Sequence, residues 1–207
     1  KDLVDRTEAL KTNPIVRHLL ETPKDPYETD CLPPRADDLD QEVGPADLFT
    51  PLPADSSQLA AVVGSARGCD FVLDGPPGTG KSQTIANMIA HNLALGRKVL
   101  FVAEKRAALD VVHRRLVQHG LGPFCLELHS NKAAKLDVLR QLDSAWTAAE
   151  ENPAEDWKRK AEELKKRRDL LNGYVAALHK RRANGMTLHQ AIGRVGREGG
   201  EQLIRPE

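Results

Sequence analysis

The sequence predicts an α/β fold, in which helices cover an incomplete parallel sheet and a helical arm is appended. Two observations predict it. Between residues 54 and 132, apolar runs of strand length alternate with amphipathic helical stretches, an order typical of parallel sheets. After residue 133 the apolar residues recur at helical spacing instead. Four regions are therefore expected: a proline-rich lead-in (1–53), an α/β core (54–132), a helical hairpin (133–183) and a glycine-rich, frayed tail (184–207).

Composition excludes several classes of protein. The 207 residues include 30 basic and 30 acidic side chains, so any nucleic-acid binding must come from a local patch. Aromatic residues make up only 4%, which argues against a base-stacking RNA-recognition module. No apolar stretch of 18 residues and no signal peptide is found, so no membrane partner and a cytoplasmic location are expected. The chain begins at Lys1 instead of Met, which indicates a processed or excised piece of a longer protein.

Cysteine and histidine patterns indicate no metal site. Cys31, Cys69 and Cys125 are odd in number and far apart, with no Cys-x-x-Cys pair. Neither zinc nor a disulfide framework is indicated, and buried thiols in a reducing compartment are expected. The histidines at positions 91, 113 and 129 also lack ligand spacing, so they are expected at the surface or at strand ends.

Prolines, capping residues and glycines mark where the expected elements of the lead-in and the core begin and end. A short helix is expected near Asp5–Leu20, interrupted by Pro14, and the prolines after it forbid long elements. The core elements follow from caps, stops and periodicity. In order, they are a helix capped by Asp55, a strand over 70–74, a helix from Lys81 that stops at Gly96, a strand over 99–103, a helix that stops at Gly120, and a strand over 124–128.

The arm is predicted from two apolar seams on either side of Pro153. Before the proline, apolar residues step by three and four along residues 139–149. After it, apolar residues recur every seven positions at Trp157, Leu164, Leu171 and Leu178, and Arg168 interrupts the alternate seam. Complementary seams on consecutive helices predict an antiparallel hairpin of the coiled-coil kind.

The most specific motif is GPPGTGKS, which fits G-x-x-x-x-G-K-[ST] from Gly75 to Ser82. It follows a predicted strand and opens a predicted helix, the context that a phosphate-binding P-loop requires. Glycines let backbone N–H groups point at the phosphates, and the helix N-terminus adds partial positive charge. Lys81 can bridge the terminal phosphates, and Ser82 can ligate Mg²⁺. The sequence thus predicts a P-loop nucleoside triphosphatase; the alternative is a plain glycine-rich turn with an exposed lysine.

Residues around this loop resemble superfamily 1 DNA/RNA helicases, in the 5′-to-3′ branch related to the nonsense-mediated-decay helicase. GPPGTGKSQT resembles motif I of that family, and VLFVAEKRAALDVV resembles motif Ia. Where the family usually has Pro-Ser-Asn in motif Ia, this chain has Glu104, Lys105 and Arg106. DSSQLAAV places Gln58 where the family's glutamine reads the adenine edge.

The resemblance implies a RecA-like core and a set of site residues. ATP is expected to contact Gln58, Gly75, Pro76, Pro77, Gly78, Thr79, Gly80, Lys81, Ser82 and Gln83. Lys81 and Ser82 are then the catalytic residues, with Ser82 holding Mg²⁺. Lys105 and Arg106 are the expected contacts to single-stranded DNA or RNA. A helical insertion after motif Ia is also similar in kind to the predicted arm, where a protein partner is a further expectation.

Three features keep simpler alternatives. Gln58 lies three residues after Asp55, so it can complete a helix capping box. Lys105 and Arg106 can form a solvated helix start, although ligands gather at the carboxyl ends of parallel strands. The basic run KKRR at 165–168 is nearly balanced by acidic neighbours and is expected to be a solvated face.

A hydrolytic motor needs more than this chain contains. No Asp-Glu dipeptide is present to complete the Mg²⁺ shell, and the second RecA-like domain of the family is missing. The leading prediction is a motor fragment of a helicase or translocase that couples ATP hydrolysis to strand movement in the full-length protein. The alternatives are an AAA+ ATPase and a noncatalytic, nucleotide-gated scaffold that recruits partners through the helical hairpin.

Overall fold

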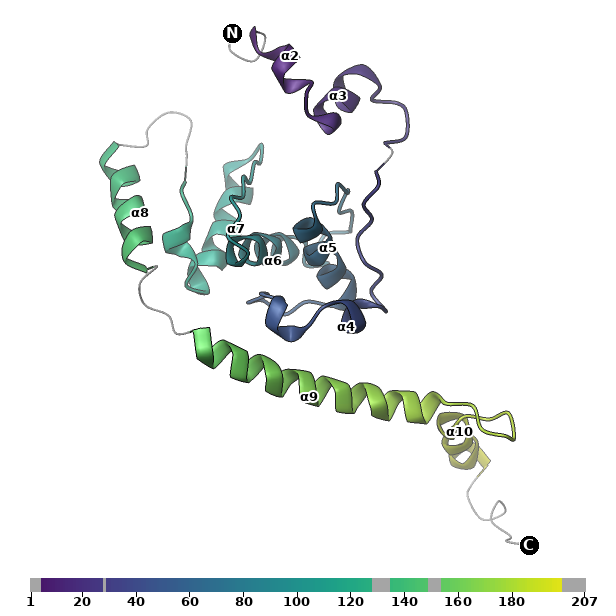
Figure 1. Ribbon diagram of the computed structural model, residues 1–207. Coiled ribbons are helices and arrows are strands. Elements are labelled where there is room, and N and C mark those ends of the chain that lie inside the picture. Colours follow the sequence, from purple (N-terminus) through teal and green to yellow (C-terminus); the bar gives the residue numbers. More distant parts are fainter. Residues whose placement is uncertain (1–4, 28, 128–134, 149–153, 199–207) are drawn as a thin grey trace, which may run out of the picture. The chain divides into compact units, whose positions relative to one another are not determined.

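A computed structural model describes residues 5–27, 29–127, 135–148 and 154–198, which fall into two compact units (Figure 1). The first unit is formed by Lys1–Leu39 and Phe49–Cys125, and the second by Asp40–Leu48 and Leu126–Glu207. Each unit is described by itself below. None of the helices in the described part of the chain combines the length and apolar character that a bilayer crossing requires.

The lead-in of the first unit contains two short helices, α2 (Thr7–Leu10) and α3 (Pro14–Glu21). Pro14 is the first residue of α3, where a missing N–H costs no intrahelical hydrogen bond. Asn13 caps this helix, because its side chain accepts from the backbone N–H groups of Ile15 and Val16. The expected interruption at Pro14 is therefore confirmed, and the proline acts as a helix start.

A disulfide joins the lead-in to the end of helix α5 (Ser56–Arg67). Cys31 and Cys69 are 38 positions apart in sequence, yet their Cα atoms lie 4.9 Å apart. Pro33 packs so closely on α5 that a Cβ at Gly64 would lie 2.8 Å from its side chain. The prediction of unbonded thiols is wrong for these two cysteines, because this packing brings distant positions together. Cys125 keeps its thiol, which donates to the Leu121 carbonyl.

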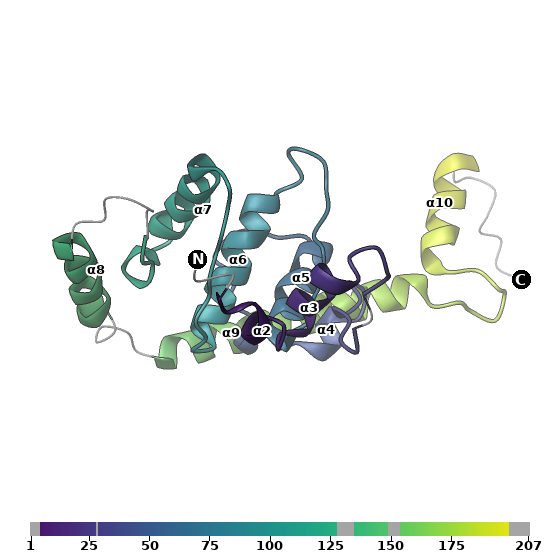
Figure 2. The same ribbon diagram turned by 90° about the horizontal axis from the view of Figure 1, so that it is seen from above.

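Helix α6 (Lys81–Ala94) is central to the first unit and packs against both α5 and α7 (Arg106–Gln118) (Figures 1 and 2). Ala86 and Ile89 of α6 form the apolar core with Val112 and Leu116 of α7. The predicted glycine stops are confirmed, because Gly96 and Gly120 follow these helices with φ of 75° and 77°. Glycine is the residue that adopts this left-handed conformation without steric cost.

The predicted parallel sheet is wrong, because the described residues contain no β-strand. The runs at 70–74 and 99–103 are extended segments, and the third run begins in the 3₁₀ helix η2 (Gly122–Phe124). Phe101 and Cys125 pack on the α6–α7 core, whereas Val72 and Leu100 are 92% and 86% exposed. A strand requires hydrogen bonds to a neighbouring strand, and among the described residues none of these runs is paired in that way. Position 128 of the third run lies outside the described residues.

The second unit is organised around the long helix α9 (Ala154–His179), which packs along residues 40–48. That segment contains most of α4 (Leu39–Glu42) and the 3₁₀ helix η1 (Pro45–Asp47). Trp157 Nε1 donates to the Ala46 carbonyl at 3.0 Å. Arg168 and Asn172 donate to the Val43 carbonyl and the Asp40 carboxylate at 3.0 and 2.7 Å.

This packing corrects two expectations about α9. Arg168 turns inward, so the KKRR run is solvated only in part. Leu164 and Leu171 of the predicted heptad seam are 57% and 63% exposed, because α9 contacts residues 40–48 through another face, which carries Trp157, Arg168 and Asn172. Helix α8 (Lys135–Ala148) precedes α9 in the chain, and the predicted break at position 153 lies outside the described residues. Pairing of α8 with α9 stays a prediction.

Residues 184–198 are more ordered in structure than the frayed tail predicted for them. They form a turn and helix α10 (Leu188–Glu198), which packs on α9. Thr187 and Gln190 cap the helix reciprocally, since the Thr187 N–H donates to Gln190 Oε1 and the Gln190 N–H donates to Thr187 Oγ1. This cap fixes the start of α10 despite the glycines that follow.

Candidate nucleotide-binding site

The loop between residues 74 and 81 curls in a way that glycine alone allows. Gly78 and Gly80 have φ of 88° and 80°, in the left-handed region. At Gly75, an added Cβ would lie 2.8 Å from Thr79 Oγ1. The three glycines of GPPGTGKS therefore stand where the backbone conformation or a close approach requires them, as the P-loop motif predicts.

Lys81 holds the two ends of this loop together. Its ammonium group donates to the carbonyl oxygens of Gly75 and Pro76, the latter at 2.9 Å. Thr79 Oγ1 also donates to the Pro76 carbonyl at 2.9 Å. A lysine ammonium has three N–H donors, so two hold the loop and a third remains for an oxygen of a bound anion.

Gln58 connects the start of α5 to the same loop. Its Oε1 accepts from the Asp55 N–H at 3.1 Å, and Asp55 Oδ1 accepts from the Gln58 N–H at 2.8 Å, which confirms the capping box. Hydrogen bonds from the Ser57 hydroxyl and then the Gln58 N–H lower the pKa of Asp55. The Gln58 Nε2 donates to the Thr79 carbonyl at 3.0 Å, so one side chain caps the helix and binds the loop.

The first turn of α6 supplies further donors. Gly80 is the N-cap and offers no side chain to the helix end, and its carbonyl accepts from the N–H groups of Gln83 and Thr84, each at 2.9 Å. The N–H groups of Lys81 and Ser82 precede the first intrahelical hydrogen bonds, and the helix dipole makes this end electropositive. The loop carbonyls thus bond to Lys81, Gln58 and the helix. The Gly75 N–H donates to Asp74 Oδ1 at 2.7 Å, so the groups left for an anion are the N–H groups of Lys81 and Ser82 and the Lys81 ammonium.

These residues fit the phosphate groups of a nucleotide and the magnesium ion that accompanies them. Among the described residues, no group of three or more His, Cys, Asp or Glu side chains gathers to hold a metal ion. Mg²⁺ at phosphate sites keeps several waters and takes most of its other oxygens from the phosphates. One protein oxygen, such as the hydroxyl of Ser82 on the first turn, meets that need.

Three polar side chains of α6 form a ladder that sequence analysis missed. Gln83, Asn87 and His91 are four residues apart, so they lie on one face of the helix. Gln83 Nε2 donates to the Pro53 carbonyl, and Asn87 exchanges two 3.0 Å hydrogen bonds with the backbone of Leu52. His91 Nδ1 accepts from the Phe49 N–H at 3.3 Å. The detectable signal was a polar side chain at every fourth position, on one face of a helix whose core face carries Ala86 and Ile89.

His91 is therefore buried instead of lying at the surface as expected. Only 3% of it is exposed, and its ring lies 5.9 Å from the ring of Phe49. Burial, and then the charge of Arg97, lower the pKa of His91 below its ordinary value of 6.5. Because the neutral ring accepts the Phe49 hydrogen bond, protonation at Nδ1 would abolish it. Gln83, an expected ATP contact, likewise bonds to Pro53 in this structure, and its contact with ATP stays a prediction.

Residues 53–194 match the AAA domain family, and this match covers more than half of the chain. This chain belongs to the AAA domain family. The matched range contains the whole phosphate loop, Gln58 and helices α5 to α9. The hydrogen-bond donors found at the loop are consistent with ATP binding by a domain of this family.

Two curated relatives of this AAA domain come from mycoplasmas. The chain is 55% identical over 47 residues to the "Uncharacterized ATP-dependent helicase MG140" of Mycoplasma genitalium. It is 62% identical over 48 residues to the homologue of that protein in Mycoplasma pneumoniae. Each match covers 23% of this chain and 4% of the relative, so the chain spans a small part of these proteins. No solved structure matches.

The matches support a helicase-like family for this AAA domain. Both relatives are named as ATP-dependent helicases, which agrees with the family predicted from GPPGTGKSQT. Assignment to the 5′-to-3′ branch related to the nonsense-mediated-decay helicase stays a prediction.

Lys105 and Arg106 lie where α7 begins. Lys105 is the exposed N-cap, and Arg106 Nε lies 3.7 Å from Asp110 Oδ1, one turn along the helix. Both residues are thus exposed at the start of a helix. The surface ion pair of Arg106 is weak, so Lys105 and Arg106 both remain accessible to a ligand. Their contact with nucleic acid stays a prediction.

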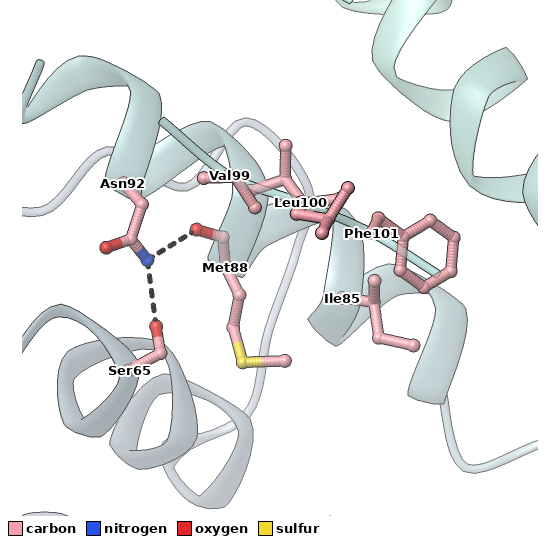
Figure 3. A pocket seen from close by; sticks show the side chains of 8 residues that line it. Ser65, Ile85, Met88, Asn92, Val99, Leu100 and Phe101 are labelled. Carbon is pink, nitrogen blue, oxygen red and sulfur yellow. Dashed lines mark hydrogen bonds between the residues drawn. The ribbon is translucent and has the colours of Figure 1, made fainter. Parts of the chain in front are cut away.

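An apolar groove lies apart from the phosphate loop. It has a volume of about 280 Å³ and is lined by α5, α6 and the extended segment Val99–Phe101 (Figure 3). Asn92 Nδ2 bridges one wall by donating to Ser65 Oγ at 3.0 Å and to the Met88 carbonyl at 2.9 Å. None of residues 75–82 lines this groove, so it is not the expected nucleotide site.

Proposed function

We propose that this AAA domain binds ATP through Gly75–Ser82 and is the ATP-binding part of a helicase-type motor. The observation that carries the proposal is the Lys81 ammonium, which bonds to two loop carbonyls and keeps one N–H for an anion. Positive φ at Gly78 and Gly80 supports it, because a curled loop directs successive N–H groups toward one point.

Five of the expected site residues have distinct roles in this proposal. Lys81 binds the terminal phosphates and neutralises their charge, and Ser82 directs its hydroxyl to Mg²⁺. Bound Mg²⁺ would supply charge neutralisation between the β and γ phosphates. Gln58 positions the loop by donating to the Thr79 carbonyl. We also propose that Gln58 recognises the edge of the adenine base. Lys105 and Arg106 contact the phosphates of single-stranded DNA or RNA, which the full-length protein would move as it hydrolyses ATP.

The test of ATP binding replaces Lys81 by alanine and measures the affinity for a fluorescent ATP analogue in the presence of Mg²⁺. We expect Lys81→Ala to abolish detectable binding, because the variant loses the ammonium and the closure of the loop. The control is Lys98→Ala, at an exposed position after α6, which should bind as the wild type does. Equal affinity of both variants and wild type would refute the phosphate assignment.

The test of adenine recognition uses Gln58→Ala and compares affinities for ATP and GTP. We expect the preference for ATP over GTP to narrow. An unaltered ratio would leave Gln58 with its capping and loop contacts only.

A further inference from the structure

Basic residues concentrate at the turn between α9 and α10 and along α10. Residues 179–197 include five lysines and arginines and no aspartate or glutamate; the five are Lys180, Arg181, Arg182, Arg194 and Arg197. Earlier in α9 the charges are paired along the helix, as in Arg159 with Asp156 and Arg167 with Glu163. A chain of zero net charge therefore carries a local excess of positive charge in this stretch of the sequence, and such an excess attracts anions.

A defined turn holds this surface in place. The Gly185 N–H donates to the Arg182 carbonyl and the Arg182 N–H donates to the Met186 carbonyl, both at 2.9 Å. Gly185 has φ of 74°, which the reversal of the chain requires. The turn returns α10 to α9, and the rings of His179 and His189 stack with centroids 5.0 Å apart.

Three consecutive cations at the end of α9 are exposed to solvent. Lys180, Arg181 and Arg182 are all exposed, and none has an ion-pair partner in the described ranges 5–27, 29–127, 135–148 and 154–198. Their hydrogen bonds in the turn involve the backbone only, so the ammonium and guanidinium groups are available. Arginine guanidinium groups in particular donate paired hydrogen bonds to phosphate oxygens.

We propose that Lys180, Arg181 and Arg182, which we call the basic turn, bind the phosphodiester backbone of single-stranded nucleic acid. The proposal rests on the proposed function, in which the motor acts on such a strand. The adjacent His179–His189 stack supports it, because single-strand sites combine cations along the backbone with planar rings for the bases. Binding through phosphates makes the surface tolerant of sequence and sensitive to salt.

The test measures fluorescence anisotropy of a labelled 20-nucleotide oligo-dT and oligo-U, across a salt series, with the full chain. The variant Lys180→Ala/Arg181→Ala/Arg182→Ala is compared with Lys165→Ala/Lys166→Ala/Arg167→Ala, which removes equal charge from an exposed part of α9. A charge-preserving variant, Lys180→Arg/Arg181→Lys/Arg182→Lys, shows whether positive charge alone is sufficient for binding the oligonucleotides. Circular dichroism verifies that α9 and α10 remain folded.

We expect the first variant to bind about tenfold to a hundredfold more weakly than wild type. The slope of log affinity against log salt concentration should become smaller in magnitude by about two. Each contact to a single-strand phosphate contributes about 0.7, and the variant loses three cations. The second variant should lose less than about threefold, and the charge-preserving variant should bind nearly as wild type does. Equal losses in the first two variants would overturn the proposal, because the effect would be one of net charge alone.

Two further arms separate this inference from its basis and from another ligand. If Lys105→Ala/Arg106→Ala weakens binding while the basic-turn variant binds as wild type, the inference fails and the proposed function stands. If wild type binds the ATP analogue but neither oligonucleotide, both nucleic-acid proposals fail. Vesicles with 30% phosphatidylserine form the last arm. Stronger binding to vesicles than to oligonucleotides, lost in the basic-turn variant, would assign the surface to anionic lipid and overturn the proposal.

Discussion

The side chain of Asn87, on α6, exchanges two hydrogen bonds of 3.0 Å with the backbone of Leu52, in the segment that precedes α5. The Leu52 N–H donates to Asn87 Oδ1, and Asn87 Nδ2 donates to the Leu52 carbonyl. Asn87 is completely buried. This pair fixes the segment that leads, within a few residues, to Asp55 and Gln58, and so to the phosphate loop.

Replacing Asn87 by leucine should destabilise the domain by about 2 to 4 kcal/mol, because two backbone groups of Leu52 lose their partners. Urea denaturation measures the change in the free energy of unfolding. The control is Gln118→Leu, at the exposed end of α7, where we expect a change within about 0.5 kcal/mol. Similar free energies for the two variants would show that the Asn87–Leu52 pair is not maintained in solution.

Gly78 and Gly80 provide a matched pair for testing the loop. Both have positive φ, so alanine at either position costs about 1 to 2 kcal/mol of backbone strain. Only at Gly80 would the new Cβ also meet Gln58 Nε2, at 2.7 Å, since nothing lies within 4 Å at Gly78. We therefore expect Gly80→Ala to lower the affinity for the ATP analogue more than Gly78→Ala does.

A double-mutant cycle isolates that contact. Adding Gln58→Ala to Gly80→Ala should cost less than adding it to wild type, because the crowded amide is gone. Additive losses of affinity would mean that Gln58 does not lie against Gly80 in solution.

His91 predicts a pH dependence of stability. Its folded pKa is below the ordinary 6.5, chiefly because of burial, so the unfolded state binds more protons between the two values. The free energy of unfolding should therefore be unaffected by His91 above pH 6.5, fall as the pH drops below 6.5, and level off below the lowered pKa.

The measurement is urea denaturation between pH 5 and 8. His91→Gln keeps an acceptor for the Phe49 N–H and cannot titrate, so its profile should be flatter in this window. His119→Gln, at the exposed end of α7, should retain the wild-type slope. Parallel profiles for wild type and His91→Gln would contradict the burial of this ring.

The Cys31–Cys69 bond should contribute about 4 kcal/mol to stability, from the chain entropy of its 38-residue separation. Dithiothreitol should lower the urea midpoint of wild type and leave Cys31→Ser/Cys69→Ser unchanged. Thiol titration of the unfolded, unreduced chain should count one thiol. Three thiols, with a midpoint insensitive to dithiothreitol, would contradict the bond.

Sequence patterns could predict the features that depend on near neighbours in the chain. The cap at Asp55, the stops at Gly96 and Gly120 and the glycines of the phosphate loop follow from backbone sterics and from hydrogen bonds over a few residues. The loop motif also led to the helicase-like family that the comparisons support.

Other features depend on which distant segments meet, and sequence patterns could not decide them. The run at 99–103 is apolar throughout, and period alone does not distinguish a strand in a sheet from an extended segment with one covered side. Hydrogen bonds to a second strand decide between them, and such bonds are a tertiary property.

The amino-acid sequence by itself determined the phosphate loop, the helix ends around it and the excess of positive charge near residue 180. Only the tertiary structure decided that Cys31 meets Cys69, that His91 is buried and that Gln58 contacts the Thr79 carbonyl. The physical reason is one of range. Local conformation is set by steric limits and hydrogen bonds within a turn, whereas these contacts join residues that are 21 or more positions apart, or depend on burial by such segments.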